Sequence, residues 1–197
     1  MEIEWTDEGR ALMDSKVHVV CLGGPGSGKT TMALLKAEAE IRLNTLKSGQ
    51  RILFLSFARA TISRVEEHAK KILRSESRHE LEINTYHGFT WGLLRSHGYL
   101  LTENSPIELL APPQAASLLS SLNSDDEKAQ EKMRLFEDKG LLDFDLFAPK
   151  AAELLARSES IRKLVSKTYP IIILDEFQDT NDDEWALIQL LGIDSRL

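Results

Sequence analysis

The 197-residue chain has little cysteine and no long hydrophobic run. Cys21 is its single cysteine, so an internal disulfide is excluded and the composition is typical of a reducing compartment. Because its neighbours are apolar, we expect Cys21 to be a buried core residue rather than a reactive thiol. No segment reaches the roughly 18 apolar residues of a membrane span, and the acidic start of the chain lacks the basic residues of a signal peptide. These absences predict a cytoplasmic protein without a membrane partner.

Basic charge is also scarce. Against 24 Lys and Arg stand 31 Asp and Glu, for a net charge of −7. Dedicated nucleic-acid modules are usually basic, so any contact with nucleic acid must be local. The contents of hydrophobic residues (42%) and charged residues (28%) are ordinary for a globular protein with a buried core. The length permits one domain that carries at most an inserted subdomain.

A glycine-rich stretch in the first quarter of the chain matches the G-x-x-x-x-G-K-[ST] pattern of a phosphate-binding loop. An apolar strand is predicted before it, over residues 17–22, and a helix after it, from Lys29 to about residue 47. Glycines let backbone N–H groups surround a polyphosphate, and a helix N-terminus adds its free donors. A chance glycine-rich turn is the alternative. The predicted nucleotide-binding residues are Gly23, Gly24, Pro25, Gly26, Ser27, Gly28, Lys29, Thr30 and Thr31.

A second motif follows an apolar run at residues 171–174 and reads Asp-Glu-Phe-Gln-Asp-Thr over 175–180. Such a run predicts a buried parallel strand that delivers acids to the carboxyl edge of a sheet. We expect Lys29 to neutralise the β- and γ-phosphates of ATP, and Thr30 and Asp175 to hold Mg²⁺. Glu176 would orient and deprotonate the attacking water. An acidic helix start at residues 179–183 is a compatible second interpretation.

The remaining periodicity predicts an α/β fold with a parallel sheet flanked by helices. Further strands are expected at 51–56, 82–85 and 170–175, and helices at about 60–74, 86–97 and 182–191. Strand signals vanish from 99 to 168, where the patterns indicate helices. The sequence therefore predicts an α/β domain in two parts, 1–98 and 169–197, separated by an all-helical insertion, 99–168.

Four motifs, in order and rough spacing, resemble the N-terminal half of superfamily 1 DNA helicases of the UvrD/Rep type. Residues 23–30 and 175–180 look like motifs I and II of that family, residues 52–61 are similar to motif Ia, and residues 83–89 are similar to motif Ib. The resemblance implies a RecA-like P-loop NTPase fold with the insertion as subdomain 1B. It implies an ATP-dependent DNA helicase with ATP and Mg²⁺ as cofactors. Gln178 resembles the residue that senses the γ-phosphate, with a surface glutamine as the alternative.

The resemblance also implies contacts with single-stranded or partly duplex DNA. In the family, motifs Ia and Ib touch single-stranded DNA, where aromatic rings stack on bases and hydroxyls and backbone amides hold phosphates. Core packing is the alternative for Phe57 and Phe89, a structural histidine for His87, and a solvated surface residue for Arg59. The candidate DNA-binding residues are Phe57, Arg59, Thr85, Tyr86, His87 and Phe89.

Two departures from the family pattern affect what we expect. Gly9 stands where the family usually has a glutamine that reads adenine, so nucleotide choice is expected to be looser, and Arg10 is a candidate to lie near the base or phosphates. The chain also ends where motif III should begin. We therefore expect a fragment or a truncated protein that depends on the remaining helicase domains or on a partner subunit. In the family, arginines from the later motifs stabilise the transition state and raise the rate about 10³–10⁵-fold. Without them we expect weak ATPase at most and no unwinding.

Three functions are consistent with these patterns. The first is the ATP-binding part of a DNA helicase or translocase. The second is a regulatory or accessory nucleotide-binding module that works only with a nuclease or helicase partner. The third is another P-loop enzyme, such as a small-molecule kinase, which leaves the two DNA-contact motifs unexplained.

Overall fold

The computed structural model describes residues 7–24, 26–57, 59–102 and 105–197, with only the backbone at residues 59 and 60. Nine α-helices and five strands are found in this part of the chain. The helices are α1 (Asp7–Asp14), α2 (Lys29–Arg42), α3 (Arg59–Ile72), α4 (Tyr86–His97), α5 (Pro112–Leu119), α6 (Asp125–Lys139), α7 (Phe147–Arg157), α8 (Glu159–Thr168) and α9 (Asp182–Gly192). The strands are β1 (Ile52–Ser56), β2 (Leu81–Thr85), β3 (Glu108–Leu109), β4 (Leu141–Leu142) and β5 (Ile171–Leu174).

The main sheet is parallel and has the strand order β2-β1-β5. Ile52 is in register with Leu81 on one side and with Ile171 on the other. All five residues of the central strand β1 are buried, as expected for a strand of a parallel sheet that is covered on both faces. The predicted α/β class, with a parallel sheet flanked by helices, is confirmed.

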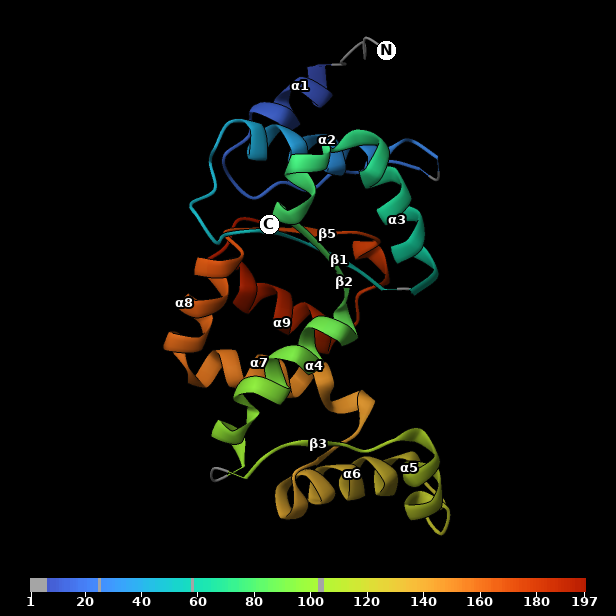
Figure 1. Ribbon diagram of the computed structural model, residues 1–197. Helices are drawn as coiled ribbons and strands as arrows, with labels where there is room; N and C mark the ends of the chain where they lie inside the picture. The colour runs from blue at the N-terminus through green and yellow to red at the C-terminus, as the bar shows by residue number, and fades with distance from the viewer. Residues whose placement is uncertain (1–6, 25, 58, 103–104) are drawn as a thin grey trace. The chain divides into compact units, whose positions relative to one another are not determined.

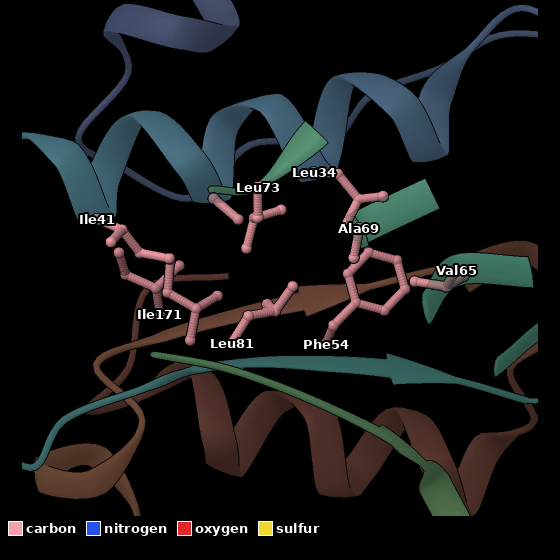
Figure 2. Packing of buried hydrophobic residues seen from close by; sticks show 10 residues of the cluster. Leu34, Ile41, Phe54, Val65, Ala69, Leu73, Leu81 and Ile171 are labelled. Carbon is pink, nitrogen blue, oxygen red and sulfur yellow. The ribbon is translucent and has the colours of Figure 1, made fainter. Parts of the chain in front are cut away.

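Helices α2 and α3 lie on the same face of this sheet (Figure 1). Side chains alternate along a strand, so every second residue of β1 faces these helices. Phe54 lies among Leu34 of α2, Val65 and Ala69 of α3 and other apolar side chains (Figure 2). This packing fixes the position of α2, whose first residues follow the glycine-rich loop, against the carboxyl ends of the strands.

The prediction of a strand over residues 17–22 is wrong. Residues 17–24 contain no regular strand, Val20 and Leu22 are 71% and 88% exposed, and Cys21 is exposed rather than buried. The Val19 N–H donates to the Leu197 carbonyl at 3.1 Å, and the adjacent Arg196 forms an isolated bridge with Ile171, on the edge of β5 that β1 does not occupy. A strand is stabilised by a ladder of hydrogen bonds to a neighbouring strand. Among the described residues, Arg196 contributes a single bridge rather than a ladder, so the apolar segment has no strand to pair with and stays exposed.

The described residues fall into two compact units. The first contains the residues up to Thr85 together with Lys163–Asp179 and Leu191–Leu197, and the second contains Tyr86–Arg162 and Thr180–Leu190. The main sheet, α2 and α3 belong to the first unit. The division predicted from the sequence, at residues 98 and 168, stays a prediction.

The second unit is helical apart from one short strand pair. In it α4 packs on α7, and a separate small core forms around Leu110, Ala115 and Leu135. A two-residue parallel pair, β3 with β4, lies within the segment that the sequence predicts to be all-helical. Runs of two residues carry no periodicity, which is why the pattern missed them. In the described part of the chain, no helix is both long and apolar enough to cross a membrane.

Candidate nucleotide-binding site

The glycine-rich loop has the backbone that its glycines permit. Gly26 and Gly28 have φ angles of 75° and 83°, in the left-handed region that favours glycine. A Cβ on Gly23 would lie 2.5 Å from the Ser27 Oγ, so that position tolerates no side chain without a shift. The Ser27 N–H donates to the Gly24 carbonyl at 3.2 Å and closes the turn. Pro25, which the sequence places in the same loop, lies outside the described residues.

Lys29 is the first residue of α2, and its ammonium group points back over the loop. Its Nζ donates to the carbonyls of Gly23 at 2.8 Å and of Gly24 at 3.1 Å. Gly28, the N-cap of α2, brings no capping side chain, and the first turn of the helix carries no acid. The helix N-terminus therefore presents a cation and backbone donors, which is an arrangement that suits an anion such as a polyphosphate.

Thr30 and Asp175 come together from α2 and from the end of β5. The Thr30 Oγ1 donates to the Asp175 Oδ1 at 3.3 Å, although 145 positions separate them in the sequence. Asp175 is 8% exposed. Within the residues that the structure describes, its second oxygen, Oδ2, is buried without a hydrogen-bond partner. Burial raises the pKa of Asp175 above its ordinary value, and the neighbouring carboxylate of Glu176 raises it further, against the opposing hydrogen bond from Thr30.

This donor set fits a magnesium ion. Mg²⁺ prefers oxygen ligands and is commonly held by one or two protein groups together with phosphates and water. A hydroxyl and a carboxylate already stand within hydrogen-bond distance, and the unpartnered Asp175 Oδ2 is left for a further cation or donor. A cation there would also compensate the buried negative charge.

Glu176 differs from Asp175 although the two are adjacent. It has a positive φ of 54° and an exposed side chain. The Gln178 Nε2 donates to its Oε2 at 2.5 Å, so the two residues predicted to act on the water and the γ-phosphate are hydrogen-bonded to each other. The expected helix start nearby is present as well, because Asn181 caps α9 by accepting from the Glu184 N–H at 2.9 Å.

The residues proposed to contact DNA have different environments. Tyr86 is 2% exposed and Phe89 is 7% exposed, so both side chains are buried. A buried ring cannot stack on a base unless its side chain moves, and for Phe89 this matches the core-packing alternative. His87 is exposed, and Phe57 and Thr85 are partly exposed. The side chain of Arg59 lies outside the described residues.

An aromatic cluster around His87 was not expected from the sequence. Within the second unit, the His87 ring lies 6.1 Å from the Phe144 ring and 5.9 Å from the Phe147 ring, and Trp91 stacks on Phe147 at 5.6 Å. The cluster borders a pocket of about 130 Å³ that Asp183 of α9 also lines. Phe144 and Phe147 come from about 60 residues further along the chain than His87, so no local pattern could have indicated the cluster.

Gly9 and Arg10, the residues at the departure from the family pattern, lie on α1. Gly9 is buried and Arg10 is exposed. Neither observation tests the proposed place of Arg10 near the nucleotide.

The comparisons with known proteins agree with this geometry. A family model described as an AAA domain matches residues 9–197. The chain belongs to the AAA domain family. It is also 22% identical over 219 residues to the DNA helicase II of Haemophilus influenzae, in an alignment that covers 89% of this chain and 30% of that protein. The chain thus spans less than a third of the length of this relative. The resemblance to the N-terminal part of UvrD/Rep-like helicases is confirmed.

Proposed function

We propose that the chain is the ATP-binding N-terminal portion of a UvrD/Rep-like DNA helicase or translocase, which couples ATP hydrolysis to movement on DNA or to its unwinding. The observation that carries the proposal is the contact between Thr30 of α2 and Asp175 at the end of β5. It brings together the two parts of the proposed phosphate and magnesium site at the carboxyl ends of the strands. The family and the relative named DNA helicase II support a helicase-like nucleotide-binding domain.

Each residue of the site has a role that follows from its position. Lys29 would exchange the two loop carbonyls for the β- and γ-phosphates, while the backbone donors of the loop bind the same oxygens. Thr30 and Asp175 would hold Mg²⁺, which supplies charge neutralisation of the phosphate oxygens. The exposed Glu176 can reach a water molecule and accept its proton. Gln178, hydrogen-bonded to Glu176, would link the position of that carboxylate to the γ-phosphate.

The DNA-binding part of the proposal depends on fewer residues. We propose single-stranded or partly duplex DNA as the partner, contacted by the exposed His87 and by Phe57 and Thr85. Because the chain spans 30% of the relative, the whole activity is proposed to require the other helicase domains or a partner subunit. A cytoplasmic location is part of the same proposal.

Equilibrium binding tests the nucleotide site. A fluorescent ATP analogue is titrated with the chain in the presence of Mg²⁺ and, separately, in EDTA, with Lys29→Ala and Asp175→Asn as variants. Lys29→Ala should lose binding under both conditions, and Asp175→Asn should lose only the gain that Mg²⁺ gives. Wild-type binding that neither substitution affects would refute the assignment of the site. Competition with GTP in the same assay measures base selection.

A regulatory or accessory nucleotide-binding module is the second candidate. Its support is Gly9, which is buried on α1 and has no side chain with which to read adenine. Stimulation of ATP hydrolysis by single-stranded DNA separates the two functions. A motor domain should respond when the remaining domains are supplied, whereas an accessory module should respond only to its partner protein.

A further inference from the structure

Ser56 ends the central strand β1 and has a buried hydroxyl without a partner. The residue is fully buried, and its Oγ has no hydrogen-bond partner among the described residues. Ser56 lies in the stretch that is similar to motif Ia but is not among the candidate DNA-binding residues. A buried polar group without a partner costs free energy, and such groups are found where an ion, a ligand or another state of the protein supplies the partner.

The sheet places Ser56 beside Asp175. Leu55 is in register with Leu174, so the next residues, Ser56 and Asp175, are neighbours on adjacent strands, with backbones about 4.8 Å apart by the usual strand spacing. The Asp175 N–H donates to the Leu55 carbonyl at 2.9 Å, which carries the pairing to this level.

The two side chains also lie on the same face of the sheet. Phe54 and Ile173 pack in the core under α2 and α3, and residues two positions further along a strand return to the same face. Ser56 and Asp175 therefore both face α2, whose Thr30 contacts the Asp175 Oδ1. Among the described residues, the remaining Asp175 oxygen, Oδ2, is also buried without a hydrogen-bond partner.

We propose that Ser56 is a positioning residue for the magnesium site. When Mg²⁺ and nucleotide bind, the Ser56 hydroxyl turns about its Cα–Cβ bond and donates a hydrogen bond to the Asp175 Oδ2. That bond satisfies both orphaned atoms and fixes the carboxylate so that its Oδ1 stays toward Thr30 and the ion. The inference rests on the proposed function, since it concerns the same site.

The test measures the Mg²⁺ dependence of nucleotide binding. A fluorescent ATP analogue is bound to the chain in EDTA, MgCl₂ is then titrated, and the concentration that gives half of the Mg²⁺ effect is recorded. Ser56→Ala should raise this concentration about tenfold, the effect of losing one hydrogen bond to a charged group. Binding in EDTA should not change, because Lys29 and the loop are intact. Ser56→Thr, which retains the hydroxyl, should restore the wild-type Mg²⁺ dependence.

A matched control separates a positioning role from a structural one. Ser77→Ala changes another buried serine of the same unit, in the short 3-10 helix Ser75–Glu80, and should leave the Mg²⁺ dependence unchanged.

The possible failures can be told apart. If Asp175→Asn abolishes the Mg²⁺ effect and Ser56→Ala leaves it unchanged, the inference is overturned and the proposed function stands. The inference is equally overturned if Ser56→Ala lowers only the thermal stability, because the hydroxyl then serves the fold, for example through Thr85 on the other neighbouring strand. A wild-type chain without any Mg²⁺-dependent binding would overturn the proposed function and this inference with it.

Discussion

Glu40 of α2 is a carboxylate with 1% of its side chain exposed, and it is surrounded by cations from three parts of the first unit. Lys36 lies 2.8 Å away, Lys16 lies 3.2 Å away, and Arg196, from the last residues of the chain, lies 2.8 Å away. Thr45 adds a hydrogen bond at 3.0 Å. The carboxylate thus ties α2 to the segment before the glycine-rich loop and to the residue that bridges β5.

We predict that Glu40→Gln destabilises the chain in a pH-dependent way. Burial by itself would raise the pKa of Glu40, but the hydrogen bonds from Lys36, Lys16 and Thr45 and the charge of Arg196 outweigh it and lower the pKa from 4.5 to about 2. That shift corresponds to about 3 kcal/mol at neutral pH, in line with the cost of removing one partner from a buried ion pair. A folded-state pKa below the unfolded one gives stability that is present above about pH 4.5 and is lost as the pH falls toward 2.

The assay is urea unfolding of both proteins at pH 7.0 and at pH 3.5. The free-energy difference between wild type and Glu40→Gln should fall from about 3 to about 2 kcal/mol, because wild-type Glu40 loses part of its advantage while glutamine does not titrate. Glu67→Gln, at an exposed glutamate of α3, should change the stability little at either pH. An equal difference at both pH values would refute the electrostatic reasoning and indicate a loss of shape or packing instead.

Three other changes test single features of the fold and site. Gly140→Ala should destabilise the second unit by about 1–2 kcal/mol in thermal unfolding, because Gly140 has a φ of 67° and a new Cβ would lie 2.7 Å from the Pro106 carbonyl oxygen. Ser124→Ala removes the capping box of α6 and should cost about 1 kcal/mol in the same measurement. Asp175→Asn should raise the urea midpoint of the metal-free chain at pH 7, since burial and Glu176 disfavour the charged form of Asp175, while it abolishes Mg²⁺-dependent nucleotide binding.

Local sequence signals predicted most of the elements because their causes are local. Pro112 opens α5 and Ser124 caps α6, and each is visible as a residue type at a helix start. The sharp turns of the glycine-rich loop followed from its glycines, two of which have a positive φ. The juxtaposition of Thr30 and Asp175 also followed, because parallel strands and their following helices bring such residues to one edge of a sheet.

The misses have non-local causes. The apolar segment 17–22 has the composition of a strand, but a strand forms only beside a partner of sufficient length. In the described residues, the chain next to it contributes a single bridge, between Arg196 and Ile171, rather than a strand. The same cause exposes Cys21. The Glu40 network joins Lys16, Lys36 and Arg196 across most of the chain, and no window of the sequence contains all of them.

The sequence predicts different roles for the adjacent acids Asp175 and Glu176, and the structure gives them different environments. Asp175, the first residue after β5, still donates its N–H to the Leu55 carbonyl and stays buried beside Thr30. Glu176 has a φ of 54°, and its side chain is exposed and accepts a hydrogen bond from Gln178. A buried acid next to a hydroxyl suits a cation, and an exposed acid suits proton transfer with water. These environments support the proposal that Asp175 serves the metal and Glu176 the water.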